Sequence, residues 1–510
     1  MQKPDAENKI FNIAAGFIRN SNHPVFLTGK AGTGKTTFLR YIKENCVKQT
    51  AIVAPTGVAA INAGGTTIHS FFQLPFGPFL PTQRKWGQSA VSNKSSLMAD
   101  MKLSNERKEI MQQLELLIID EVSMVRCDVL DAIDTVLRQV RKQYSKPFGG
   151  VQVLYIGDMY QLPPVVKEEE WKILSEVYSS PFFFGSQVIQ EQLPVYVELQ
   201  KVYRQTDENF IRLLNQVRNN EMDDAGYSLL HSRFMPEFTP GNDDNFITLT
   251  THNHKAEAIN SKALRLIPHK QVSFKAGIDG SFQEGSFPAD EVLLLKPGAQ
   301  VMFLKNDMEK VKRFYNGKIG VVQQIDDDKI WVECLQHNNK QLIEVKRETW
   351  QNIRYSLNHT TKQIEEETLG SFTQFPLRLA WAITIHKSQG LTFQKAIIDA
   401  AGAFAPGQVY VALSRCTSLE GIVLHSKINF KSLISDQRIV DFAASQVNIQ
   451  EKEALLRGAS KEYEIQIVRD ALDFSQLEFL LEEFRDWLQL NNFFGQPVIP
   501  WIDSFVQKIF

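Results

Sequence analysis

The sequence predicts an α/β protein with two lobes that each contain a parallel sheet, together with a small inserted β module. Continuous apolar runs at residues 114–120 and 151–158 end in acidic residues, a pattern typical of parallel strands buried on both faces. Near the N-terminus, a glycine-rich loop follows a β-prone run at 25–28 and precedes a helix-like run. Between residues 306 and 375, short β-rich runs alternate with polar turns, as in a small all-β unit.

Composition limits the classes of function that are open to the chain. Its 510 residues, 43% of them hydrophobic, are enough for three or four domains with sizeable cores. The net charge of −2 means that any nucleic-acid partner has to be held by a local basic surface. Four scattered cysteines form neither a metal motif nor a disulfide framework, which is typical of a reducing compartment. With a polar start and no long apolar run, we expect a cytoplasmic protein without a membrane span.

The order of these signals predicts the domain boundaries. The first lobe is expected at 1–185, with an inserted, wedge-like segment at 74–101 that is rich in Pro, Ser and Gly and has no clear period. The second lobe is expected at 186–305 and 376–445, interrupted by a β-barrel-like module at 306–375. An acidic, partly helical C-terminal tail, 446–510, carries 11 acidic and 6 basic residues and is not expected to be needed for the activity of the lobes. Its helical period at 476–490 fits either a docked helix or a partner-binding one.

The loop that follows the first predicted strand has the pattern G-x-x-x-x-G-K-[ST]. Small residues allow its backbone N–H groups to surround phosphates, and the helix that follows adds partial positive charge. We expect Lys35 to neutralise the β- and γ-phosphates and the Thr36 hydroxyl to bind Mg²⁺. A glycine turn without chemical meaning is the alternative, and the flanking strand and helix disfavour it. The predicted nucleotide-binding residues of this loop are Gly29, Ala31, Gly32, Thr33, Gly34, Lys35, Thr36 and Thr37.

Hydrolysis of a bound nucleotide also needs a metal ligand and a group that orients water. The pair Asp120 and Glu121 follows a buried strand, so we expect Asp120 to hold Mg²⁺ and Glu121 to polarise the attacking water. Gln161 follows the next strand and is a candidate for reporting whether the γ-phosphate is present. Its neighbours Pro163 and Pro164 leave a purely structural turn open as the alternative.

Nine stretches together carry a family resemblance: GKAGTGKTT, APTGVAAINAGGTTIHSFF, IIDEVSM, GDMYQLPPV, LQKVYRQTDENF, LKPGAQVMFLKND, YNGKIG, LAWAITIHKSQGLTF and GQVYVALSRCTSLEGI. Across about residues 25–430 the chain resembles a superfamily 1 helicase of the petite-integration-frequency family, close to the RecD-like helicases. The resemblance implies two RecA-like P-loop lobes with ATP and Mg²⁺ between them. It also implies 5′-to-3′ movement on single-stranded DNA in genome maintenance.

The same resemblance assigns further site residues. Arg204 and Arg415 are expected to reach the γ-phosphate from the second lobe, and Gly390 to approach the nucleotide. Loops that match strand-contacting elements of the family give the predicted DNA-binding residues, which are Thr56, Gly57, His69, Phe71, Phe72, Thr251, His252, Asn253, Thr384, His386 and Lys387. Phe72 suits base stacking, although a core phenylalanine is an equal alternative. A basic run between Lys305 and Lys318 fits either a backbone-tracking surface or a solvated loop.

The leading hypothesis is therefore an ATP-driven DNA helicase that acts as a monomer on single-stranded DNA and on tailed or forked duplexes. G-quadruplex DNA is a further candidate partner. A nucleotide-gated clamp that binds without unwinding is a second hypothesis, and Glu121 with the two arginines argues against it. An RNA helicase stays open, while a small-molecule P-loop kinase is disfavoured by the motifs after residue 190. His252 and His254 lack further ligands at zinc spacing, so we do not expect a zinc site.

Overall fold

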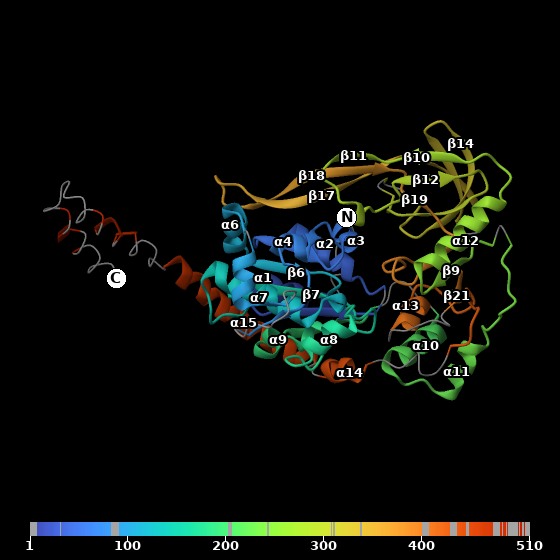
Figure 1. The fold of residues 1–510 in the computed structure, drawn as a ribbon. Coiled ribbons are helices and arrows are strands. Elements are labelled where there is room, and N and C mark those ends of the chain that lie inside the picture. The colour runs from blue at the N-terminus through green and yellow to red at the C-terminus, as the bar shows by residue number, and fades with distance from the viewer. Residues whose placement is uncertain are drawn as a thin grey trace.

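The computed structural model shows two α/β lobes side by side, with a β-rich module and its long hairpin extending over the first lobe (Figure 1). The structure describes residues 8–30, 32–82, 91–101, 103–201, 207–241, 244–307, 309, 312–336, 339–399, 407–428, 436–444 and 448–472, with single positions between 480 and 504. Among these residues, no helix combines the length and the apolar character that a membrane crossing needs.

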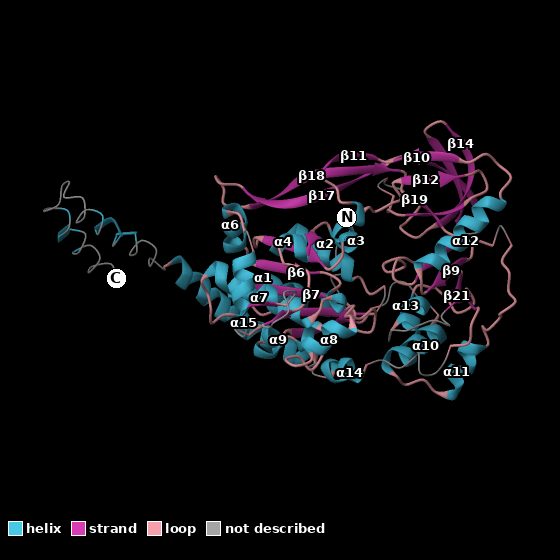
Figure 2. Ribbon diagram, in the orientation of Figure 1, coloured by secondary structure: helices cyan, strands magenta, loops and turns pink. Residues whose placement is uncertain are grey.

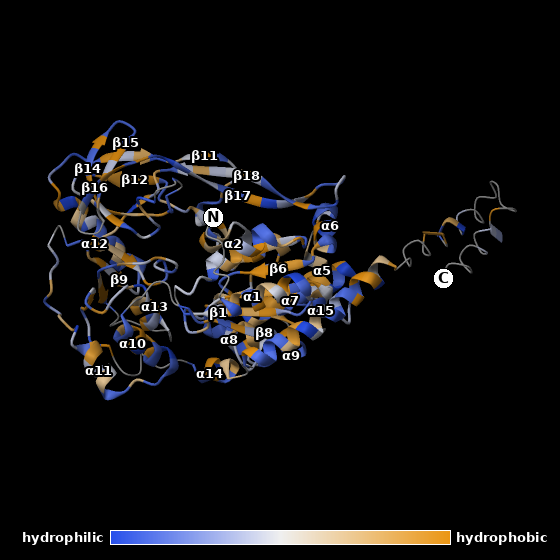
Figure 3. Cartoon of the chain, turned by 180° about the vertical axis from the view of Figure 1, so that it is seen from behind, coloured by the Kyte–Doolittle hydropathy of each residue, from blue (hydrophilic) through white to orange (hydrophobic). Residues whose placement is uncertain are grey.

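The first lobe contains a six-stranded parallel sheet whose central strands are fully buried. Its strands, in spatial order, are β3 (Thr66–Thr67), β2 (Thr50–Ala54), β6 (Leu116–Ile119), β7 (Gln152–Ile156), β1 (Val25–Gly29) and β8 (Val195–Leu199). All residues of β1, β6 and β7 are buried, which explains their unbroken apolar runs. Figure 3 shows these hydrophobic strands enclosed by helices with hydrophilic outer faces.

Helices cover both faces of this sheet (Figure 2). They are α1 (Lys9–Asn20), α2 (Lys35–Asn45), α3 (Gly57–Ala63), α4 (Ile68–Phe72), α5 (Lys94–Asp100), α6 (Asn105–Gln113), α7 (Cys127–Arg141), α8 (Glu168–Leu174) and α9 (Gln187–Glu191). Side-chain caps begin several of them: the Asn8 carboxamide accepts from the Phe11 N–H at the start of α1, and Thr56 Oγ1 accepts from the Ala59 N–H at the start of α3. Helix α1 therefore begins at Lys9, directly after its cap.

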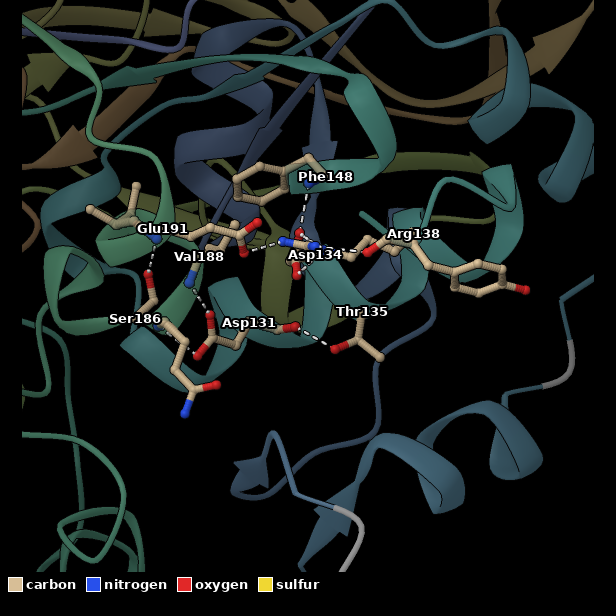
Figure 4. A network of polar contacts seen from close by, with 11 residues as sticks. Asp131, Asp134, Thr135, Arg138, Phe148, Ser186, Val188 and Glu191 are labelled. Carbon is tan, nitrogen blue, oxygen red and sulfur yellow. Dashed lines mark hydrogen bonds and ion pairs between the residues drawn. The ribbon is translucent and has the colours of Figure 1, made fainter. Parts of the chain in front are cut away.

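A polar network holds α7 and α9 together beneath the sheet (Figure 4). Asp131 on α7 accepts hydrogen bonds from the Gln187 N–H at 2.9 Å, the Val188 N–H at 3.0 Å and the Tyr178 hydroxyl at 2.8 Å. Burial raises the pKa of Asp131 to about 6, although these three donors oppose the rise. The carboxylate therefore caps the first turn of α9 from another helix.

The second lobe contains a four-stranded parallel sheet. Its order is β20 (Ala382–Thr384), β9 (Ile247–Thr250), β21 (Ala396–Asp399) and β22 (Ile422–Leu424). The associated helices are α10 (Glu208–Asn219), α11 (Asp224–His231), α12 (Asn253–Leu266) and α13 (Gln408–Ser414). Two parallel sheets with helices confirm the predicted fold class.

The inserted β module is larger than the sequence predicted. Its antiparallel sheets comprise β16 (Asn339–Val345), β15 (Lys329–Gln336), β14 (Ile319–Asp326), β13 (Gln300–Phe303) and β19 (Leu377–Leu379); β11 (Gly277–Gly280), β18 (Ile364–Gln374) and β17 (Glu348–Leu357); and β10 (Val272–Lys275) with β12 (Val292–Leu295). The predicted start at 306 is therefore wrong, because the β-rich unit begins at Val272. One missed strand, β11, pairs with a distant partner, with Ile278 opposite Phe372, so no local pattern marks it. The other missed strands have nearer partners, as β10 has in β12.

Two boundaries of the lobes also need correction. The first lobe does not end at residue 185, because β8 pairs in parallel with β1, with Phe26 opposite Tyr196. The second lobe does not extend to 445, because α14 (Gln437–Ala443) returns to the first lobe, where the Phe442 ring stacks on Phe184 at 4.6 Å. Both β8 and α14 bury aromatic rings at the edge of the first sheet, and this burial stabilises their position there.

The C-terminal tail begins with α15 (Ile449–Ala471), which packs on α1. Leu456 fits against Gly16, where a Cβ would lie 2.8 Å from Leu456 Cδ2, and Ala459 is 3% exposed. The Lys48 ammonium lies 4.5 Å from the centre of the Tyr463 ring. The first half of α15 is therefore docked on the first lobe. Docking does not test the expectation that the tail beyond 446 is not needed for the activity of the lobes, which stays a prediction.

The wedge-like segment at 74–101 packs on the first lobe through residues near both of its ends. Strands β4 (Phe79–Leu80) and β5 (Ser92–Asn93) pair in parallel, and the Phe79 N–H donates to Asp128 on α7. Leu97 on α5 is 1% exposed in the core of the first lobe. Residues 83–90 lie outside the described residues. Apolar side chains therefore hold the segment on the first lobe. The sequence did not predict this packing, because the segment has no clear hydrophobic period.

Candidate nucleotide and strand-binding site

The glycine-rich loop connects β1 to α2 at the carboxyl edge of the first sheet. Gly32 and Gly34 have φ values of +83° and +94°, which only glycine adopts without strain. A Cβ at Gly29 would lie 2.5 Å from Thr33 Oγ1 and 2.8 Å from the Leu199 carbonyl oxygen. The Thr33 hydroxyl donates to the Lys30 carbonyl oxygen at 2.9 Å and closes the turn. Ala31 lies outside the described residues.

The helix α2 begins at Lys35, so Thr36 and Thr37 lie in its exposed first turn. Lys35 Nζ donates to the carbonyl oxygens of Gly29 at 2.6 Å and Lys30 at 3.2 Å. Burial lowers the pKa of Lys35, and the nearby carboxylates of Asp158 and Glu121 oppose that shift. The lysine therefore already lies inside the loop, with acidic side chains in reach of its charge.

Two carboxylates end strand β6 beside this lysine. The Asp120 N–H donates to the Val53 carbonyl oxygen at 2.9 Å, and Glu121 adopts a left-handed conformation with φ of +51°. Burial and then the Glu121 charge raise the pKa of Asp120 to about 7. Burial also raises the pKa of Glu121, which Lys35 and Arg415 oppose. Two crowded carboxylates favour a bound cation, so this donor set with the Thr36 hydroxyl fits Mg²⁺.

The described residues contain no group of three or more His, Cys, Asp or Glu side chains arranged to hold a metal ion. A magnesium site of the kind expected here does not need such a cluster, because phosphate oxygens and water supply most of its ligands.

The second lobe reaches this site through Arg415, which is 2% exposed. Its Nη2 donates to Gln161 Oε1 at 3.0 Å, and Gln161 Nε2 donates to Asp158 Oδ2 at 3.1 Å. Burial lowers the pKa of Arg415, while Glu121 acts in the opposite direction. A Cβ at Gly407, the residue before α13, would lie 2.5 Å from the Gln161 carbonyl oxygen, so the lobes meet closely at this loop.

Most predicted nucleotide-site residues therefore lie together. Arg204 is outside the described residues, and its role stays a prediction. Gly390 has φ of +76° and is exposed, with no other atoms within 4 Å of the position a Cβ would take. Sequence reasoning missed Asp158, although it follows β7 much as Asp120 follows β6. It also missed Glu198 and Arg218, which lie in ordinary-looking strand and helix patterns.

The predicted strand-binding residues fall into exposed and buried groups. The exposed group, which we place at the rims of the two lobes, comprises Thr56, His252, Asn253 and Lys387. His69 and His386 are partly buried, and burial lowers the pKa of each. Thr251 and Thr384 are 5% and 4% exposed. Thr251 Oγ1 lies 2.7 Å from His252 Nδ1, and Thr384 Oγ1 accepts from the Lys387 N–H, so both threonines orient the neighbouring residues.

Phe71 and Phe72 do not fit the strand-contacting role that the motif suggested. They are 4% and 0% exposed, and their rings meet edge to face at 4.8 Å within the core of the first lobe. The alternative of a core phenylalanine therefore describes Phe72 in this structure. The exposed aromatic ring beside this helix is that of Phe76, which is 87% exposed and stacks on His69 at 5.1 Å.

The β module lies close to the predicted strand-binding residue Gly57 of the first lobe. Ser286, in the single turn Glu284–Ser286, packs on Gly57 at the start of α3, where a Cβ would lie 2.3 Å from Ser286 Oγ. The hairpin β17–β18 continues along the lobe, and the Tyr355 hydroxyl accepts from the Ile52 N–H at 2.8 Å. These contacts cover part of the surface that includes Gly57.

A phosphate-binding loop, a carboxylate pair and an arginine from a facing α/β lobe define a two-lobed P-loop NTPase. A family model described as PIF1-like helicase matches residues 4–227. The Campylobacter jejuni protein named ATP-dependent DNA helicase Pif1 is 30% identical, over 82% of this chain and 94% of that protein. The chain belongs to the PIF1-like helicase family.

Other relatives extend the comparison. The mouse protein named ATP-dependent DNA helicase PIF1 is 33% identical over 87% of this chain, which spans 64% of that longer protein. The crystal structure of Bacteroides sp Pif1 in complex with ADP-AlF4 is 43% identical, over 86% of this chain and 96% of that one, with a TM-score of 0.77. Bacteroides Pif1 bound to single-stranded DNA is 42% identical, over 87% and 97%, with a TM-score of 0.58.

Proposed function

We propose that this protein is an ATP-dependent DNA helicase that moves 5′ to 3′ on single-stranded DNA and unwinds tailed or forked duplexes. The single observation that carries the proposal is the contact of Arg415 with Gln161, because it joins the second lobe to the phosphate site of the first. Names and bound states of the relatives support ATP and DNA as the substrates. Direction of movement rests on family membership.

The side chains divide the chemistry among themselves. Lys35 and the amides of the glycine-rich loop hold the β- and γ-phosphates, and Thr36 with Asp120 holds Mg²⁺. Bound Mg²⁺ supplies positive charge to the phosphate oxygens. Glu121 accepts a proton from the attacking water. The Gln161 carboxamide lies near the γ-phosphate. Arg415, together with Arg204, stabilises the charge that develops as the bond to the γ-phosphate breaks.

The strand passes over the rims of both lobes in this proposal. Thr56, Asn253 and Lys387 are exposed there and suit phosphate contacts, which position a strand without reading its sequence. Hydrolysis changes the contact between the lobes at Arg415 and Gln161, so the two rims move relative to each other once in each cycle. Such alternation is what a motor needs to step along a strand. We propose that one copy of the chain is enough for this cycle.

The decisive experiment compares unwinding of matched duplexes with 5′ or 3′ tails, each in DNA and RNA versions. The proposal requires ATP-dependent displacement of the 5′-tailed DNA duplex. Strand binding without displacement would instead support a nucleotide-gated clamp, and preference for RNA tails would support an RNA helicase. A G-quadruplex placed in the duplex path extends the same assay to that substrate. Since two of the relatives are bacterial and DNA is in the cytoplasm of bacteria, we place the activity there.

A further inference from the structure

Arg218 connects the second lobe to three residues of the first lobe. It lies near the end of α10 and is 6% exposed. Its Nη1 lies 2.9 Å from Glu198 Oε1 on β8, and its Nη2 lies 3.9 Å from Asp158 Oδ1 after β7. The guanidinium carbon lies 4.3 Å from the centre of the Tyr160 ring. A single side chain thus contacts β8 and the loop after β7, the two neighbours of strand β1, which leads into the phosphate loop.

The charge of Arg218 is kept despite its burial. Burial lowers the pKa of this arginine, but Asp158, Tyr410 and Glu198 together outweigh that effect and raise it. A buried guanidinium is stable only where carboxylates and ring faces replace its water. Because the planar group meets Glu198 at one end and a ring at its face, its position is well defined.

The contacts of Asp158 lead from Arg218 to the reacting phosphate. Asp158 Oδ1, which faces Arg218, also accepts from the Tyr160 N–H at 3.2 Å. Asp158 Oδ2 accepts from Gln161 Nε2, and Gln161 Oε1 accepts from Arg415. The Asp158 carboxylate therefore helps to orient the Gln161 carboxamide, and Arg218 lies on the other side of that carboxylate. The chain of contacts runs from α10 through the first lobe and returns to α13.

We propose that Arg218 is a positioning residue for ATP hydrolysis, which holds the loop of Asp158 and Gln161 in place against the second lobe. The inference rests on the proposed ATPase function. Arg218 touches neither the nucleotide nor the attacking water in this assignment and acts only through Asp158 and Gln161. Movement of α10 with the second lobe would shift this loop, so Arg218 links the relative position of the lobes to the rate of hydrolysis.

The test compares Arg218→Ala and Arg218→Lys with Arg212→Ala. Arg212 lies on the same helix but is exposed, with a loose 3.5 Å ion pair to Asp223, so it serves as the matched control. At saturating single-stranded DNA, we expect Arg218→Ala to lower kcat by about 10- to 100-fold, because misplacing a catalytic group by about 1 Å costs this much. The Kd for a fluorescent ATP analogue should change less than about threefold. Arg218→Lys should recover part of kcat, and Arg212→Ala should match the wild type.

A double variant separates positioning from a general structural role. If Arg218 acts through Gln161, adding Arg218→Ala to Gln161→Ala should lower kcat little further, because the group it positions is already absent. Multiplied losses in the double variant, or a kcat of Arg218→Ala equal to that of the control, would overturn the inference. If Arg218→Ala fails to fold, Glu198→Gln removes the 2.9 Å ion pair while keeping the shape, and the same two outcomes apply. Absence of wild-type ATPase would instead contradict the proposed function.

Discussion

Gln161 Oε1 in the first lobe lies 3.0 Å from Arg415 Nη2 in the second lobe. In this arrangement the arginine is directed at the carboxamide next to the phosphate site, and Lys35 lies nearby on the loop carbonyls. A γ-phosphate that entered between these groups would offer oxygens to both Lys35 and Arg415. We infer that nucleotide binding exchanges contacts within the protein for contacts with phosphate, which lowers the cost of desolvating these charges.

We expect Arg415→Ala to reduce turnover by about 10³- to 10⁵-fold, the usual contribution of an arginine at the γ-phosphate. Nucleotide affinity should fall much less, because the loop and Lys35 remain. The measurements are steady-state ATPase with single-stranded DNA and binding of a fluorescent nucleotide. Gln161→Ala, which removes the partner but not the charge, is the comparison and should lose less. A drop of less than tenfold for Arg415→Ala would remove it from this role.

Glu121→Gln should bind ATP and single-stranded DNA but hydrolyse about 10²- to 10⁴-fold more slowly, as expected when a general base is lost. The carboxamide keeps the shape of the side chain but cannot accept a proton from water. Lys35→Ala is the contrasting variant, since its charge contributes to binding as well as to catalysis. Parallel nucleotide titrations and ATPase assays distinguish the two. Near-normal turnover of Glu121→Gln would contradict the catalytic assignment.

The parts of the site that sequence could predict are those with a local pattern. The glycine-rich loop, Asp120 and Glu121 were predictable because strand, turn and helix signals stand next to them in the chain. Arg218 was not, because its partners Asp158 and Glu198 are brought to it by folding and its helix pattern is ordinary. The burial of Phe72 was likewise not visible in the motif that contains it.

In the fold, too, features with a local pattern were predictable and features that depend on distant contacts were not. Buried parallel strands such as β6 and β7 were predicted from their apolar runs alone. The full extent of the β module was not, because strands such as β11 pair with partners far along the chain, here β18. The return of α14 to the first lobe depends on the fit of Phe442 among distant aromatic rings. Contacts of this range leave no periodic signal in either partner.

Phe76→Ala should impair duplex unwinding while sparing ATPase stimulated by single-stranded DNA. The ring is 87% exposed, stacks on His69 and lies near the start of the wedge-like segment 74–101, which we predict separates the strands of the duplex. An aromatic ring that stacks on a base contributes about 1–3 kcal/mol of binding free energy. Removal of the ring would destabilise the separated strands at the fork by this amount. Tyr144→Ala, which removes another exposed ring of the first lobe, is the control. Equal loss of both activities would indicate a structural role for Phe76.

Asp131→Ala should lower the unfolding free energy of the first lobe by about 2–4 kcal/mol. Three donors lose their acceptor, and unpaired buried groups cost about 1–3 kcal/mol each before the structure relaxes. The network in Figure 4 also predicts faster hydrogen exchange at the Val188 amide. Thr135→Ala, on the same helix, should change stability by about 0.5 kcal/mol or less. Urea denaturation with hydrogen exchange provides both measurements, and equal stability of the two variants would exclude the capping role.

Lys48 predicts a pH dependence that also tests the docking of α15. Lys48 is 6% exposed, and its ammonium donates to the Ser21 carbonyl oxygen and Gln152 Oε1 and lies against the Tyr463 ring. Burial lowers the pKa of Lys48 to about 8 from the usual 10.5, although Cys46 and Glu115 oppose the shift. Between these two pH values the unfolded chain binds the proton and the folded one does not, so stability should rise with pH.

The rise should reach about 3 kcal/mol across this window, because each unit of pKa shift corresponds to about 1.36 kcal/mol. Lys48→Met cannot titrate, so the difference in unfolding free energy between the wild type and this variant isolates the effect from other groups. A chain that ends at Ala444 lacks Tyr463, and its Lys48 should regain water and a higher pKa. The pH-dependent difference should therefore shrink in the shortened chain. A difference that stays constant from pH 7.5 to 10.5 in the full chain would show that Lys48 is not desolvated, and that α15 does not cover it in solution.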